Sequence, residues 1–215
     1  MNRPDKTRAA AWDSEEDRAI FARMQDPTDY LSKTGRTILE LDPNAYRQLV
    51  PAESGLVQAR DILESTQPQD LVSGPVKDRE SARALLAALW LWHDYLDESH
   101  RISQKIETPT GSFWHAIMHR REGDFSNSKY WYARCSSHPA LAPLAAQANL
   151  IVHPHPADKN LLRIVMNGFN PNALVDLVEE VHERPQDPRH PIAVQLQQLE
   201  FRVLLQHCTR AAAGA

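Results

Sequence analysis

The chain has 215 residues, a formal net charge of −4 at pH 7, and a composition that is 42% hydrophobic and 24% charged. These proportions are typical of a single globular domain and exclude a wholly disordered chain. Because a protein that binds polyanions needs a clustered positive field, the acidic balance argues against nucleic acid as a partner.

The sequence carries no pattern typical of export or membrane insertion. Residues 1–17 include basic side chains without an apolar run, and no segment has the roughly 20 apolar residues that a membrane helix needs. Two cysteines, Cys135 and Cys208, are too few for a disulfide framework. We therefore expect reduced thiols, a cytoplasmic location and no membrane partner.

Proline, glycine and capping residues divide the chain into helical segments. No strand alternation, hairpin motif or internal repeat is found. The sequence therefore predicts an all-α fold, a single irregular bundle of roughly eight to ten helices over residues 13–209, with flexible ends at 1–12 and 210–215. The predicted helices are, approximately and in chain order, 14–24, 43–50, 55–65, 77–105, 112–121, 126–134, 139–152, 158–167, 171–184 and 192–209.

The longest predicted helix, 77–105, changes character along one stripe. At 100° per residue, apolar side chains in its first half share a face with ligand-type groups in its second half. A buried polar group without a partner costs about 1–3 kcal/mol, so this row needs partners, a wet cavity or solvent. The alternative is that the helix leaves the core near Leu96. The polar members of the stripe are His93, Asp97, His100 and Gln104.

The helix that follows carries a second polar stripe. His115 and His119 are four residues apart, and Glu122 follows one turn later. An i, i+4 pair of imidazoles can bind one divalent metal, and the carboxylate could be a third ligand or a base acting on bound water. The alternative is a solvated face of histidine and glutamate, or histidines that are hydrogen-bonded to neighbouring carboxylates.

A short connection, about residues 106–111, joins the two stripes. Short connections favour antiparallel neighbours, so the second helix should fold back along the first. The stripes would then face one cleft, with His100 and Gln104 opposite His115, and with His93 and Asp97 level with His119 and Glu122.

The segment after the second stripe is rich in arginine and aromatic residues. Arginine forks bind carboxylates and phosphates, and aromatic faces stack on flat or sugar-like ligands. These groups, together with Gln104, are candidates for substrate contacts, although internal ion pairs and core packing are the alternative. The candidates in this segment are Arg120, Arg121, Trp131 and Tyr132.

Residues 111–132, GSFWHAIMHRREGDFSNSKYWY, resemble the motif of a bacterial protein family. This resemblance implies that the chain is a member of that family, but it implies no activity. A second similarity is to DinB-like metal-binding helical bundles. In those bundles a His-x-x-x-His pair is followed by Arg, as in His115, His119 and Arg120, and an earlier helix supplies a third histidine. That resemblance implies His93 or His100 as the third metal ligand.

Three hypotheses follow from these patterns. In the first, His115, His119 and either His93 or His100 hold zinc, iron, manganese or nickel, with Glu122 or Asp97 as fourth ligand or base, for hydrolytic or other metal-assisted chemistry on a small polar molecule. In the second, the same pocket binds a sugar-like or anionic metabolite without metal. In the third, the chain is a helical interaction module with a contact face that includes Trp90, Trp92 and Tyr95. The oligomeric state stays open.

Overall fold

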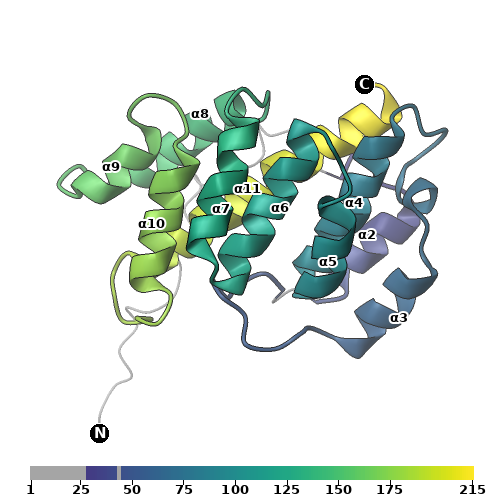
Figure 1. Cartoon of the computed structure of the whole chain (residues 1–215), viewed down its shortest axis with the longest axis horizontal. Helices are drawn as coiled ribbons and strands as arrows, with labels where there is room; N and C mark the ends of the chain where they lie inside the picture. Colours follow the sequence, from purple (N-terminus) through teal and green to yellow (C-terminus); the bar gives the residue numbers. More distant parts are fainter. Residues whose placement is uncertain (1–27, 43–44) are drawn as a thin grey trace, which may run out of the picture.

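A computed structural model describes residues 28–42 and 45–215 of the chain. Within these ranges there are ten α-helices, two short 3₁₀ helices and no β-strand, which confirms the predicted all-α fold (Figure 1). The elements are α2 (Lys33–Glu40), α3 (Val57–Ser65), η1 (Pro68–Leu71), α4 (Arg79–Trp92), α5 (Leu96–Ser103), α6 (Pro109–Glu122), α7 (Phe125–Tyr132), η2 (Ala133–Cys135), α8 (Leu141–Val152), α9 (Lys159–Val165), α10 (Pro171–Val181) and α11 (His190–Ala213).

Helix α6 is the central element of the bundle. Every residue from Gly111 to Arg121 is buried. Helices α4, α5 and α7 pack against α6, and the long helix α11 passes behind α6 and α7 in the view of Figure 1. Because α6 has no solvent-facing side over most of its length, its polar side chains must find partners inside the protein.

The ends of α6 follow local rules that the sequence contains. Thr108 caps its N-terminus, accepting a hydrogen bond from the backbone N–H of Gly111 at 3.2 Å, and Pro109 occupies the first turn. Gly123 ends the helix with φ of 86°, a left-handed conformation that glycine adopts without strain. The helix predicted over 112–121 is therefore confirmed, but it begins three residues earlier, at Pro109, and ends one residue later, at Glu122.

Arg120 joins α6 to α7 and α11 through a buried network. Its guanidinium contacts the Glu200 carboxylate at 2.5 Å and donates to the Tyr132 hydroxyl at 2.6 Å. The Tyr132 hydroxyl in turn donates to Glu200 at 2.8 Å. Arg120 and Glu200 are both completely buried, so each compensates a charge that burial alone would make very costly.

Arg121 ties the same helix to the opposite side of the molecule. Its guanidinium contacts the Asp94 carboxylate at 2.6 Å and donates to the backbone carbonyls of Leu91 and Gln48 at 3.0 and 3.2 Å. It also lies over the Tyr46 ring, 3.8 Å from the centroid. Two adjacent arginines thus fix α6 from two sides, which sets the direction in which its remaining face points.

The predicted helix over 77–105 is interrupted at His93–Tyr95, where α4 ends and α5 begins. Asp94 has φ of 60°, a left-handed conformation that helices do not contain. Tertiary hydrogen bonds hold this corner: Gly55 N–H donates to the His93 carbonyl at 2.9 Å, and the Tyr95 hydroxyl donates to the Leu56 carbonyl at 3.0 Å. A single stripe along 77–105 therefore does not exist.

The first part of the chain also differs from the prediction. Residues 45–50 form turns and bends, so the expected helix over 43–50 is wrong over its described part. Helix α2 was not predicted; Ser32 caps it, accepting from the Gly35 N–H at 3.1 Å. The flexible segment expected over 1–12 and the helix expected over 14–24 lie outside the described residues.

The last helix is longer than predicted. Helix α11 continues to Ala213, so most of the segment expected as a flexible tail, 210–215, is helical. Its end is anchored because Ala212 is completely buried and its carbonyl accepts from the Lys77 N–H at 2.8 Å. An alanine-rich sequence has high helix propensity but carries no indication of this packing.

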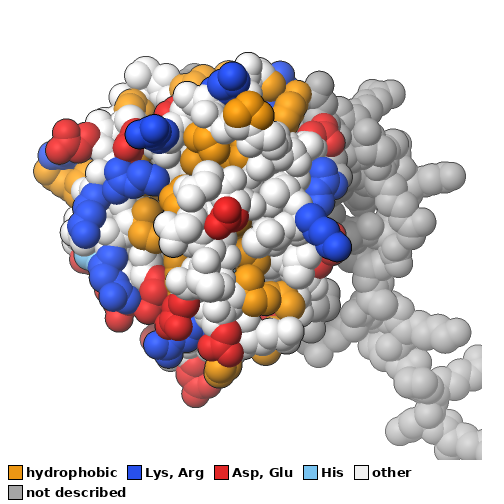
Figure 2. Space-filling view, turned by 90° about the vertical axis from the view of Figure 1, so that its right-hand side faces the viewer, with side chains coloured by type: hydrophobic (Ala, Val, Ile, Leu, Met, Phe, Trp, Pro, Cys, Tyr) orange, Lys and Arg blue, Asp and Glu red, His pale blue; other side chains and the backbone are white. Residues whose placement is uncertain are grey.

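The surface over one side of the bundle is mixed in character. Figure 2 shows acidic and basic side chains interspersed on this face, with hydrophobic side chains scattered between them. Among the described helices, none combines the length and apolarity needed to cross a bilayer.

The buried pair predicts a large asymmetry in stability. Glu200→Ala leaves the Arg120 charge buried without a counter-charge and should lower the free energy of unfolding by about 3–5 kcal/mol, as measured by urea denaturation. The double variant Arg120→Met/Glu200→Leu should recover most of this loss because no charge then remains. Glu183→Ala, at a side chain that is 87% exposed, is the matched control. Full stability of Glu200→Ala would contradict the network's role.

Candidate metal centre

The connection between α5 and α6 folds α5 back against α6. Gly111, in the first turn of α6, lies so close to this connection that a Cβ there would be 2.2 Å from the Ile106 carbonyl oxygen. Only glycine permits this approach. The close corner brings the middle of α5 over the face of α6 that the two arginines leave free.

Three imidazoles meet at this contact. His100 of α5 and His115 and His119 of α6 each offer a ligand atom, and these atoms all lie within 4.8 Å of one another. The ring of His100 lies 4.7 Å from that of His115 and 5.2 Å from that of His119, centroid to centroid. The rings of His115 and His119 are stacked at 4.6 Å. Three neighbouring imidazoles could hold a metal ion.

His115 has no hydrogen-bonding partner for its ring. The residue is 3% exposed, and both of its ring nitrogens are buried without a partner among the described residues. Its ring stacks on the Trp131 indole with a centroid distance of 4.1 Å. Burial, followed by repulsion from His119 and His100, lowers the pKa of His115 to about 3. The ring is therefore neutral at pH 7, which is the form that binds metal.

His119 is positioned by two side chains. Its Nδ1 lies 3.0 Å from a carboxylate oxygen of Glu122, and its Nε2 lies 3.1 Å from the amide Nδ2 of Asn127. Burial lowers the pKa of His119, and the Glu122 carboxylate opposes that shift. If Nδ1–H donates to Glu122, Nε2 is the acceptor of a hydrogen bond from the Asn127 NH₂ group, which a metal ion at Nε2 would replace.

Helix α7 closes the cluster from the side. The Ser128 hydroxyl donates to the Ala116 carbonyl at 2.8 Å, a buried bond that holds α7 against α6. This places Asn127 and Trp131 beside His119 and His115. Sequence reasoning missed Asn127, because the helix break at Gly123 removes any fixed angular relation between Asn127 and the histidines.

His93 does not join the three imidazoles. Its Nε2 lies 2.8 Å from the Ile38 carbonyl oxygen, and the residue is buried at the end of α4. The corner at Asp94 turns α5 away from the direction of α4, so the expected alignment of His93 with His119 is wrong. Of the two histidines considered as third ligand, the structure brings His100 to the pair on α6.

The other polar members of the first stripe lie outside the group of three. Asp97 and Gln104 are exposed residues on α5 and at its C-terminus. Asp97 precedes His100 by three residues and therefore lies one turn away on the same helix. The expected convergence of seven polar groups on one cleft reduces to three imidazoles with Glu122 and Asn127 beside them.

The expected substrate contacts from the arginine-rich segment have other partners. Arg120 and Arg121 are completely buried and pair with the Glu200 and Asp94 carboxylates, although the Nε of each has no partner among the described residues. Neither side chain is exposed, so the predicted contact of these two arginines with a substrate is wrong in this structure. Tyr132 directs its hydroxyl to Glu200. Trp131 is half-buried and forms a wall of the cluster against His115.

Comparison with known proteins gives no functional assignment. No family model, no curated protein and no solved structure matches this chain. The two resemblances of the 111–132 motif therefore stay predictions.

The buried neutral ring of His115 predicts a pH dependence. In metal-free protein the unfolded chain binds a proton at His115 near pH 6.5, whereas the folded chain does not until about pH 3. The free energy of unfolding should therefore be unaffected by this site above pH 6.5 and fall by about 1.4 kcal/mol per pH unit below it.

Chemical denaturation between pH 7 and pH 4, after treatment with a chelator, measures this slope. His115→Gln removes the titrating ring, so the difference between wild type and variant isolates the contribution of His115. An His115 imidazole that titrates near pH 6.5 by NMR would show that the ring is accessible to water in solution.

Proposed function

We propose that the protein binds one divalent transition metal ion through His100, His115 and His119 and uses it for hydrolysis of a small polar molecule. The observation that carries the proposal is the ring of His115, whose two nitrogens are buried beside two other imidazoles and have no partner among residues 28–42 and 45–215. Nearly all buried polar groups in proteins are paired, and leaving one unpaired costs about 1–3 kcal/mol. A metal ion bound to a nitrogen of this ring would remove this cost, because the nitrogen would then have a partner.

The ligand set favours catalysis over a purely structural role. Three histidines with a fourth position left for water are typical of catalytic zinc sites, whereas structural sites use four protein ligands, mostly thiolates. Both cysteines, Cys135 and Cys208, are buried elsewhere in the core and unpaired. Two reduced thiols also fit the reducing conditions of the cytoplasm, the location that we propose.

The rings need a modest contraction to bind such an ion. With zinc–nitrogen bonds of about 2.0–2.1 Å, tetrahedral geometry separates the ligand nitrogens by ~3.4 Å. The present separations of up to 4.8 Å therefore shorten by rotation of the side chains. His100 is the least buried of the three and sits on the short helix α5, so its ring has the most freedom to move.

Glu122 fits the role of a positioning residue. A carboxylate that accepts from the second nitrogen of a metal-bound imidazole fixes its tautomer and raises its basicity. Glu122 has this relation to His119, and its side chain is half exposed. When bound, the ion would polarise a water molecule or a substrate oxygen, and a nearby carboxylate would accept the proton. Asp97 and Glu122 remain the predicted candidates for that base.

The structure disfavours the two alternative hypotheses. A metal-free site for an anionic metabolite relied on Arg120 and Arg121, which are buried in internal networks. An interaction face built on Trp90, Trp92 and Tyr95 has less support, because Trp90 and Tyr95 are only 5% and 6% exposed and Trp92 is partly buried against the core.

Metal analysis of purified protein tests the proposal. We expect close to one equivalent of zinc, iron, manganese or nickel per chain, and thermal stabilisation when the chelated protein is reloaded. His115→Ala and His119→Ala should abolish both effects. His153→Ala, at an exposed histidine, is the control. Absence of metal together with no stabilisation by any of the four ions would contradict the proposal.

The positioning role of Glu122 gives a graded prediction. Glu122→Gln should weaken metal affinity about 10–100-fold without changing the one-to-one stoichiometry, because His119 loses its charged acceptor but all three ligands remain. Competition with a chromogenic chelator measures the affinity. Glu183→Gln, an exposed glutamate away from the cluster, is the matched control. Unchanged affinity in Glu122→Gln would show that Glu122 does not act through His119.

A further inference from the structure

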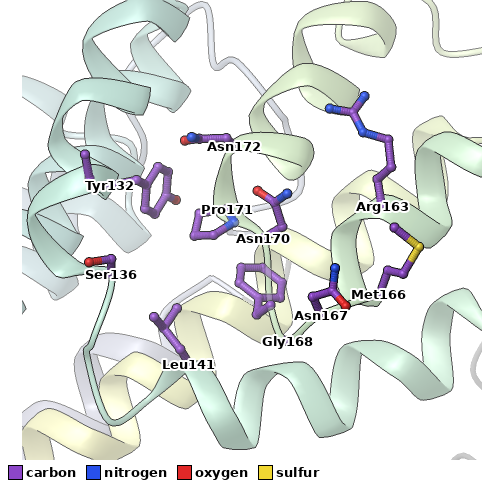
Figure 3. Close-up of a pocket in the computed structure, with 12 residues that line it drawn as sticks. Tyr132, Ser136, Leu141, Arg163, Met166, Asn167, Gly168, Asn170, Pro171 and Asn172 are labelled. Atoms are coloured by element: carbon purple, nitrogen blue, oxygen red, sulfur yellow. The ribbon is translucent and has the colours of Figure 1, made fainter.

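A pocket of about 400 Å³ lies between the end of α7 with η2, the start of α8, the end of α9 and the start of α10 (Figure 3). Its volume falls within the range of small-molecule sites, about 300–1,000 Å³. Helix α7 contributes to both this pocket and the metal centre, but through different residues: Tyr132 lines the pocket, whereas Asn127 and Trp131 contact the histidines.

The polar groups of the pocket are neutral and available. Ser136, Asn167 and Asn172 line it, and none of their side chains has a hydrogen-bond partner within the described part of the chain. Asn170 uses its amide oxygen to cap α10, accepting from the Ala173 N–H at 3.1 Å, which leaves its NH₂ group free. Amide side chains both donate and accept, so together these groups match ligand hydroxyls, which do the same.

The charge around the pocket is compensated within the protein. Arg163 is the one charged residue of the lining, and its guanidinium lies 3.5 Å from the Asp176 carboxylate, outside the lining. Asp176 also pairs with Lys129 at 2.7 Å. In Figure 3 the Arg163 guanidinium points away from Asn167. A neutral ligand therefore fits this site better than an anion.

Apolar surfaces complete the lining. Leu141 and Pro171 contribute partly exposed apolar side chains, Met166 is exposed at 69%, and Phe169 lies beneath them at 8% exposure. The turn that carries them is fixed: Gly168 has φ of 95°, and the Asn170 N–H donates to the Ile164 carbonyl at 2.7 Å. A preformed site with an apolar wall and an amide-rich edge matches a sugar ring, which has C–H faces and hydroxyl edges.

We propose that this pocket binds a neutral mono- or disaccharide. Its hydroxyls would bond to the amides of Asn167, Asn170 and Asn172, and one C–H face would pack against Leu141 and Pro171. The proposal is independent of the metal centre, since none of the three histidines lines the pocket.

Saturation-transfer NMR and calorimetry test the proposal with the full chain. The probes are glucose, N-acetylglucosamine, maltose and cellobiose, with glucose 6-phosphate and glucuronate as charged counterparts. We expect at least one neutral sugar to bind at millimolar concentration or below, more tightly than its charged counterpart. Asn172→Ala and Asn167→Ala should each weaken binding about tenfold, equivalent to ~1.4 kcal/mol.

Asn149→Ala, at an exposed asparagine of α8 outside the lining, should leave the affinity unchanged. The variants remove exposed side chains, so unfolding is not expected to obscure the result. Binding should persist after chelation, which separates this site from the metal centre. The proposal would be overturned if all four neutral sugars fail to bind, if the charged sugars bind more tightly, or if both pocket variants keep the affinity of the wild type.

Discussion

The structure depends on how α6 is oriented about its own axis, because this orientation decides which neighbour each of its side chains faces. Two consecutive arginines on a fully buried helix point to opposite neighbours, Arg120 to Glu200 and Arg121 to Asp94. Buried guanidinium groups tolerate few other arrangements, because each needs a counter-charge and several acceptors. Once both are satisfied, the direction of every other side chain on α6 is determined, including that of its two histidines.

The consequence is an electrostatic contrast along one helix. The arginines are charged, buried and paired with carboxylates, whereas His115 is neutral, buried and has no hydrogen-bond partner among the described residues. The rigid packing of α6 and α7 makes it costly to relieve His115 by moving the backbone. Binding of a ligand that forms a bond to this ring would therefore be favoured. A transition metal ion bound jointly by His100, His115 and His119 would suit three imidazoles.

Much of the site region was predictable from local patterns. The i, i+4 spacing placed His115 and His119 on one face of a helix, Gly123 marked its end, and the short connection predicted that α5 folds back. The break at Asp94 was not predictable, because His93–Tyr95 has no Gly or Pro and the surrounding residues favour helix. Hydrogen bonds from Gly55 and to Leu56, about forty residues away in the chain, override that local preference.

The sequence by itself determined the helical class of the protein, the C-terminal end of α6 to within one residue and the pairing of two histidines, because glycine conformations and helical periodicity act over a few residues. The predicted start of this helix at residue 112 was three residues late, because Thr108 caps it and Pro109 opens it. Tertiary structure alone decided that His100 and not His93 completes the cluster, and that Arg120 and Arg121 are internal braces and not substrate ligands. These outcomes depend on carboxylates and backbone carbonyls that distant segments of the chain contribute. No local sequence pattern relates those segments, so the partners of a buried group cannot be predicted from its neighbours in the sequence.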